Sequence, residues 1–137
     1  MRRWGTWTGG IILAAGLAIV AACGGSSSSP SSNPTPGACT PSANANTLVI
    51  QNNTICPPAL TVTRGTQVTI LNSDSRTHEM DSDPHPEHTD CPELNQIGFL
   101  SPGQSRQSGN LNTARKCGMH DHASPDTASL KATITIQ

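Results

Sequence analysis

The chain has 137 residues, of which eight are lysine or arginine and nine are aspartate or glutamate, giving a formal net charge of −1 at pH 7. This near balance offers no basic surface for phosphates, so we expect no nucleic-acid partner. Both tryptophans lie within the first seven residues and tyrosine is absent, so Phe99 is the only phenylalanine, tyrosine or tryptophan of the remaining chain. A core this poor in aromatic side chains is expected to need disulfides or a metal for its stability.

The N-terminal segment has the layout of a secretory signal. Arg2 and Arg3 precede an apolar run over residues 11–22, which is short for a membrane-spanning helix. The run ends in Val-Ala-Ala before Cys23, which resembles the bacterial lipobox, where cleavage precedes a cysteine that carries a diacylglycerol anchor. We therefore expect residues 1–22 to be a signal peptide. Cys23 would then hold the exported protein on the lipid bilayer, facing the periplasm or the cell exterior. The alternative is an ordinary cleaved signal with Cys23 incidental.

The next segment, residues 23–46, is rich in serine, proline, glycine and asparagine and has no charge. Such a composition predicts a flexible tether, because it contains almost nothing to bury. Residues 47–137 remain as a single small domain with a modest core.

Short segments with alternating apolar and polar residues predict strands in this domain. The last segment shows it best, with Leu130, Ala132, Ile134 and Ile136 on one face and polar side chains on the other. Strands are predicted at residues 47–51, 59–63, 66–72 and 129–137, with weaker signals at 97–100, 105–111 and 114–119. About seven short strands without an amphipathic helix indicate an all-β fold, a Greek-key β-sandwich or small barrel.

All five histidines lie in two short clusters. His78, His85 and His88 occur in residues 72–93, "NSDSRTHEMDSDPHPEHTDCPE", together with seven of the nine acidic residues, and this composition predicts an irregular polar loop. His120 and His122 form the second cluster. This grouping favours a metal site over scattered surface histidines, and imidazole donors without obligatory carboxylates favour copper, with zinc as the weaker candidate.

The order of these motifs resembles that of the cupredoxins. "VTILN" precedes the loop with His78, and Cys117-x-x-His120 precedes the final strand "ATITI". The resemblance implies a type 1 copper site with His78, Cys117 and His120 as ligands. It breaks at the axial ligand, since no methionine follows His120; Met80 and Met119 would need unusual geometry, and His122 is the other axial candidate.

The cysteines leave two interpretations open. If Cys23 is lipidated, four cysteines remain in an oxidising compartment, and they can form two disulfides, Cys39 with Cys56 and Cys91 with Cys117. Alternatively, Cys117 is a reduced copper ligand. A narrower resemblance, to secreted bacterial cupredoxin-like proteins with "SDPHPxHTD" and "HDH" loops, supports the disulfide.

The disulfide interpretation implies a site built from imidazoles. Its centre would be His78 with the His120 and His122 pair, completed by His85 or His88. The carboxylates of Asp81, Asp83, Asp90 and Asp121 are candidates for orienting the rings.

Three functions follow from these alternatives. The first is a copper-binding lipoprotein for extracytoplasmic metal handling or slow electron transfer, with a redox or metal-transfer protein as partner. The second is a blue-copper electron carrier, and the third is a metal-free structural or adhesion sandwich. We expect no enzyme, because the sequence shows no serine–histidine–acid set and no zincin motif.

Overall fold

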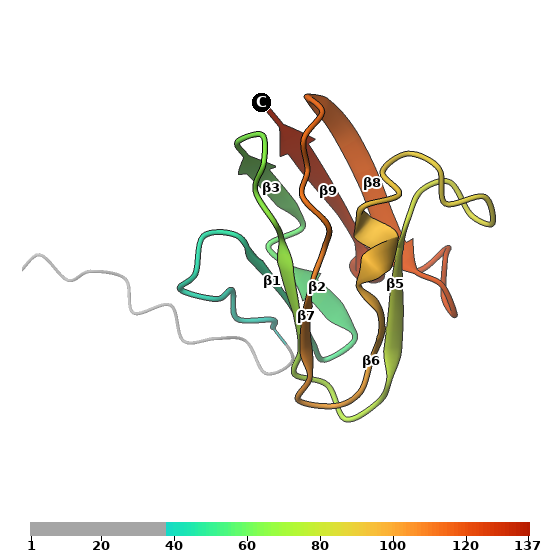
Figure 1. The fold of residues 1–137 in the computed structure, drawn as a ribbon. Coiled ribbons are helices and arrows are strands. Elements are labelled where there is room, and N and C mark those ends of the chain that lie inside the picture. The colour runs from blue at the N-terminus through green and yellow to red at the C-terminus, as the bar shows by residue number, and fades with distance from the viewer. Residues whose placement is uncertain (1–37) are drawn as a thin grey trace, which may run out of the picture. The chain divides into compact units, whose positions relative to one another are not determined.

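The computed structural model describes residues 38–137 (Figure 1). The predicted signal peptide, Cys23 and most of the predicted tether lie outside the described residues. Among the residues that are described, no helix has the length and apolarity that crossing a bilayer requires.

Nine strands and two single-turn 3₁₀ helices make up the domain. They are β1 (Thr47–Gln51), β2 (Thr54–Cys56), β3 (Ala59–Val62), β4 (Thr69–Asn72), β5 (His78–Ser82), η1 (Leu94–Gln96), β6 (Gly98–Leu100), β7 (Ser105–Gln107), β8 (Arg115–Asp121), η2 (Ala128–Leu130) and β9 (Lys131–Ile136). The predicted all-β class is confirmed, with nine strands in place of about seven.

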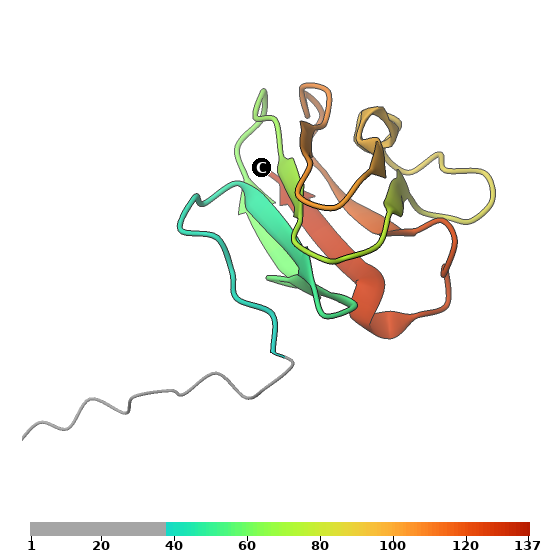
Figure 2. The ribbon, with the colours of Figure 1, turned by 90° about the horizontal axis from the view of Figure 1, so that it is seen from below.

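The strands form two sheets, one with the order β2-β1-β4-β7 and one with the order β3-β9-β8-β5-β6. Two pairs are parallel, β1 with β4 and β3 with β9, and the other neighbours are antiparallel. The loop after β5 and the turn after β8 project from the same side of the molecule in both views (Figures 1 and 2). Segments that are about 35 residues apart in sequence are thereby brought together, since β5 and β8 are hydrogen-bonded neighbours.

The core lies between the two sheets and follows from the alternation of side chains along each strand. In β9, Ala132, Ile134 and Ile136 are buried while Lys131 is exposed, as the sequence pattern predicts. The largest fully buried side chains are aliphatic or methionine: Leu48, Ile50, Ile55, Ile70, Met80, Leu94, Ile97, Leu100, Leu111, Met119, Leu130 and Ile134.

The prediction of an irregular loop over residues 72–93 is wrong in one part, because β5 lies within it. Polar residues dominate "HEMDS", so the segment has no apolar alternation that would predict a strand. It is nevertheless paired on both sides, with β6 and with β8, and Met80 is fully buried. Tertiary pairing here overrides a weak strand propensity.

Two disulfides join segments that are distant in the sequence. Cys39, which precedes β1, is bonded to Cys56 in β2, with 5.9 Å between the Cα atoms. Cys91, in the loop after β5, is bonded to Cys117 in β8, with a Cα separation of 5.8 Å. The second disulfide fixes the loop that carries His85 and His88 to the strand that carries His120.

Candidate metal centre

The register between β5 and β8 decides which side chains share a face. Met80 lies opposite Asp121, and Asp81 lies opposite His120. Cross-strand partners point to the same side of a sheet, and successive residues point to opposite sides. Since Met80 is fully buried in the core, Asp121 points inward, and Asp81 and His120 lie on the outer face.

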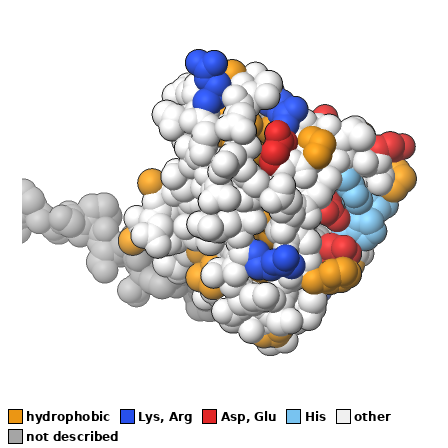
Figure 3. Space-filling view, in the orientation of Figure 1, with side chains coloured by type: hydrophobic (Ala, Val, Ile, Leu, Met, Phe, Trp, Pro, Cys, Tyr) orange, Lys and Arg blue, Asp and Glu red, His pale blue; other side chains and the backbone are white. Residues whose placement is uncertain are grey.

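Four of the five histidines come together on that outer face. His85 and His88 come from the loop after β5, His120 from β8, and His122 directly follows β8; we call these four the histidine cluster. Five ring-to-ring contacts join them, with centroid separations between 5.0 and 5.6 Å. Figure 3 shows histidine side chains gathered on one side of the molecule, next to acidic ones. One nitrogen from each of His85, His88 and His122 lies within 4.8 Å of the others, a spacing that a single metal ion can span.

The carboxylates of Asp83 and Asp81 lie close to Nδ1 atoms of the cluster. The Asp83 Oδ1 atom lies 2.6 Å from His120 Nδ1, so the N–H at Nδ1 donates to the carboxylate and Nε2 keeps its lone pair. Asp81 Oδ2 lies 3.3 Å from His122 Nδ1 and 3.8 Å from His88 Nδ1. A carboxylate that accepts one ring N–H while the other nitrogen binds a metal is the usual support of a metal-ligating histidine. Asp83 has such a bond, Asp81 lies near two rings without a hydrogen bond to either, and Asp90 makes no contact with a ring among the described residues.

The cluster meets a simple test of fit to a metal ion. Three ring nitrogens, His88 Nε2, His120 Nε2 and His122 Nδ1, are buried and make no hydrogen bond within residues 38–137. A buried polar atom without a partner costs about 1–3 kcal/mol. The group of His85, His88 and His122 could hold a metal ion, and neutral imidazole is a ligand that suits copper, zinc and nickel.

A pocket beside the cluster leaves it accessible. It has a volume of about 340 Å³ and is lined by Asp83, Pro84, His85, His120, Pro125, Asp126 and Lys131. Solvent or a small ligand therefore reaches the side of the cluster formed by His85 and His120.

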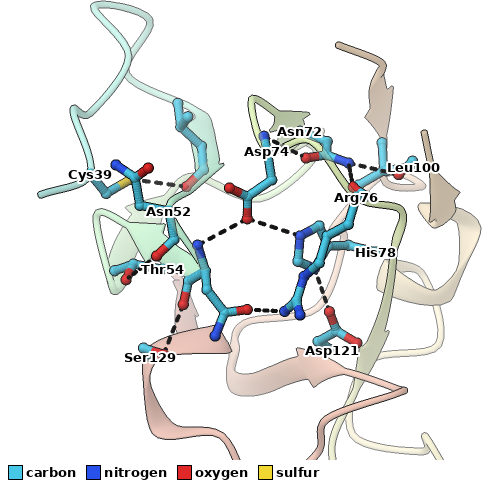
Figure 4. Close-up of polar contacts among 12 residues, drawn as sticks. Cys39, Asn52, Thr54, Asn72, Asp74, Arg76, His78, Leu100, Asp121 and Ser129 are labelled. Carbon is cyan, nitrogen blue, oxygen red and sulfur yellow. Dashed lines mark hydrogen bonds and ion pairs between the residues drawn. The ribbon is translucent and has the colours of Figure 1, made fainter. Parts of the chain in front are cut away.

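The structure places His78 apart from the cluster, on the inner face of β5. The His78 side chain is buried between two carboxylates (Figure 4), with Nδ1 2.5 Å from Asp121 Oδ2 and Nε2 3.1 Å from Asp74 Oδ2. Both ring nitrogens of His78 therefore have a carboxylate as hydrogen-bond partner, in contrast to the unpartnered nitrogens of the histidine cluster.

Asp74 belongs to this buried group and was not among the predicted residues. Burial would raise the pKa of Asp74, but hydrogen bonds from the backbone N–H of Asn53, at 2.9 Å, and from the His78 ring outweigh burial. The pKa of Asp74 therefore lies below its ordinary value of 3.8. The carboxylate stays charged beside the His78 ring at neutral pH.

The structure does not assemble the type 1 ligand set of His78, Cys117 and His120. Cys117 and His120 are three residues apart in a continuous strand and point to opposite faces of the sheet. Cys117 is fully buried, and its sulfur is bonded to Cys91. Met80 and Met119 are also fully buried in the core, away from the outer face.

Glu79 is a further residue of the outer face that the sequence analysis missed. It lies two residues before Asp81 in β5, and one oxygen of each carboxylate lies within 4.8 Å of a nitrogen of His122. The spacing of Glu79 and Asp81 would have shown that they share a face if residues 78–82 had been predicted as a strand.

The comparisons with known proteins concern the fold. No family model and no curated protein sequence matches the chain. Solved structures do match. The oxidised plastocyanin from Dryopteris crassirhizoma is 20% identical, with a TM-score of 0.52 over 66% of this chain and 99% of that one. A purple cupredoxin from Nitrosopumilus maritimus is 16% identical, with a TM-score of 0.51 over 66% and 98% of the two chains. Amicyanin from Paracoccus versutus is 14% identical, with a TM-score of 0.53 over 70% and 84%. These likenesses show that the domain has a cupredoxin-like fold.

Proposed function

We propose that this protein binds copper through the histidine cluster and serves in extracytoplasmic metal handling. The observation that carries the proposal is the convergence of His85, His88, His120 and His122 on one face, with three buried ring nitrogens that lack a partner in residues 38–137. The cluster offers only imidazole nitrogens, and these bind divalent copper more tightly than zinc. The cupredoxin-like fold supports the choice of copper.

Within this proposal, the chain's own residues prepare the ligands. Asp83 holds the Nδ1 proton of His120 and so leaves Nε2 free to bind. The Cys91–Cys117 disulfide keeps the loop with His85 and His88 over β8. Bound copper would supply a centre able to change oxidation state, and the adjoining pocket would give a metal-transfer partner access to it.

The blue-copper carrier is the less favoured alternative. Such a centre needs a thiolate, whereas Cys117, the cysteine of the predicted ligand set, is bonded to Cys91. An imidazole site with divalent copper has weak colour and favours binding and release over fast electron transfer. The predicted signal peptide and lipidated Cys23 would place the protein on a membrane outside the cytoplasm, and we propose no catalytic activity.

Calorimetric titration with Cu²⁺ tests the proposal. The unsubstituted protein should bind copper, and His88→Ala and His122→Ala should each weaken binding by at least about tenfold, because each removes one nitrogen donor. Glu87→Gln is the matched control, since Glu87 is exposed on the same loop and contacts none of the rings. Unchanged affinity in both histidine variants would refute the proposal.

A further inference from the structure

A second group of metal-binding side chains lies next to the histidine cluster. Glu79 and Asp81 project from the outer face of β5, and one oxygen of each lies within 4.8 Å of a His122 nitrogen and of the other. The backbone helps to hold this arrangement, because the His122 N–H donates to the Glu79 carbonyl at 2.8 Å. His122 is therefore part of both groups, three imidazoles on one side and two carboxylates on the other.

Asp81 is the unusual member of this group. It is only 8% exposed, yet it accepts no hydrogen bond and pairs with no lysine or arginine in the described part of the chain. Its two neighbours are ring nitrogens, His122 Nδ1 at 3.3 Å and His88 Nδ1 at 3.8 Å, and both distances exceed the 2.7–2.9 Å typical of a charge-assisted hydrogen bond. A buried carboxylate is costly unless a positive charge compensates it.

Asp83 and Asp81 differ in what their carboxylates do at this site. Asp83 makes a hydrogen bond of 2.6 Å to His120 Nδ1 and so orients that ring. Asp81 makes no such bond, and the nearby His122 Nδ1 is buried without a partner in residues 38–137. The His122 nitrogen is buried without a partner, and the Asp81 oxygen beside it makes no hydrogen bond within the described residues, which is the arrangement expected of two ligands that share one cation.

We propose that Glu79, Asp81 and His122 form a second divalent-cation subsite, so that the outer face of β5 and β8 binds two ions. Two carboxylates and one imidazole form a harder donor set than the histidine cluster, and zinc accepts this mixture of oxygen and nitrogen ligands. The site of the first ion is the one in the proposed function, whereas the site of the second ion is inferred from the contacts of Asp81 and Glu79. Because a neutral imidazole has one lone pair, His122 ligates only one ion at a time, so filling one subsite lowers the affinity of the other.

Zinc stoichiometry tests this inference, because zinc can occupy both subsites. Equilibrium dialysis of the purified protein against Zn²⁺, followed by elemental analysis, should give two equivalents. Glu79→Gln should bind one, and the double variant His85→Ala with His88→Ala should also bind one. Glu87→Gln, the exposed control on the same loop, should keep two. Glu79 is half-buried and near the surface, so its replacement by glutamine should leave the fold intact, which circular dichroism can check.

The outcomes distinguish failure of the inference from failure of the proposed function. If the unsubstituted protein binds only one equivalent and Glu79→Gln keeps it, the second subsite is overturned and the histidine cluster remains as the metal site. Two equivalents in Glu79→Gln overturn the inference as well. If the unsubstituted protein binds only one equivalent, and that ion is lost in Glu79→Gln but kept in the histidine double variant, the subsite of Glu79 is supported and the proposed function is overturned. No bound zinc in any form of the protein overturns both.

Discussion

The Asp121 carboxylate lies 2.5 Å from His78 Nδ1, inside the sandwich, although both neighbours of Asp121 in the sequence belong to the histidine cluster on the outer face. One strand end thus serves two purposes. Its inward residue completes a hydrogen-bonded group with His78 and Asp74, and its outward residues offer nitrogen donors to a metal.

The first prediction concerns Asp74. Its lowered pKa means that the folded state prefers the charged carboxylate. Asp74→Asn should therefore reduce the free energy of unfolding at neutral pH by about 1 kcal/mol, a value that allows for screening by solvent. The stabilisation from Asp74 is fully present above its unfolded pKa of about 3.9 and is lost as pH falls through the lower folded pKa.

Urea unfolding followed by far-ultraviolet circular dichroism, at about pH 7 and about pH 2.5, measures this difference. Tryptophan fluorescence is unsuitable because both tryptophans lie in the first seven residues. The gap between the two proteins should close in acid; a gap of the same size at both values would contradict the assignment.

The second prediction concerns Gly118. A Cβ atom at this position would collide with the Asp83 carboxylate, which lies across β8 to reach His120. Gly118→Ala should displace Asp83 and weaken copper binding by about 10- to 100-fold, as expected when the support of a ligating histidine is lost. Asp83→Asn should weaken binding in the same direction. Lys116→Ala, at an exposed position of the same strand, is the control, and equal affinity in Gly118→Ala and Lys116→Ala would show that Asp83 has no such role.

The third prediction concerns the Cys91–Cys117 disulfide. Replacing both cysteines by alanine should lower the free energy of unfolding by about 3 kcal/mol, because a closed loop spanning 26 residues restricts the unfolded chain. It should also weaken copper binding, since the loop with His85 and His88 is then held less firmly to β8.

Cys91→Ala alone makes a sharper test of the blue-copper alternative. This variant leaves a free thiol at Cys117, which points into the core, away from His120. Addition of Cu²⁺ should therefore give no intense visible band from a copper thiolate. A deep blue adduct would show that the thiol reaches the metal and that the electron-carrier alternative holds.

The fourth prediction concerns the membrane. If Cys23 carries the lipid, Cys23→Ser should shift the protein from the membrane fraction to the soluble fraction of the producing cells. Ser26→Ala, three residues further along, should leave the distribution unchanged. Immunoblots of fractionated cells measure the shift, and membrane association that persists in Cys23→Ser would argue against the anchor.

The sequence predicted the fold where alternation was visible, as in β9, where every second residue is buried. It failed at β5, since the pattern of "HEMDS" has one apolar residue and the strand exists because β6 and β8 pair with it. Histidines from both segments lie side by side, whereas the sequence analysis grouped His78 with them and the structure places it on the inner face. That separation depends on β5 beginning at His78, because alternation along the strand puts His78 on the same inner face as Met80.

The Cys39–Cys56 disulfide also determines how a mechanical load enters the domain. Tension arriving through the chain that precedes Cys39 divides there into two covalent routes, one through residues 40–46 into β1 and one through the sulfur bridge into β2. Both strands belong to the four-stranded sheet, whereas β5 and β8 belong to the other. A pull on the N-terminal side thus enters the domain through two strands of the four-stranded sheet and not through the strands that carry the histidines.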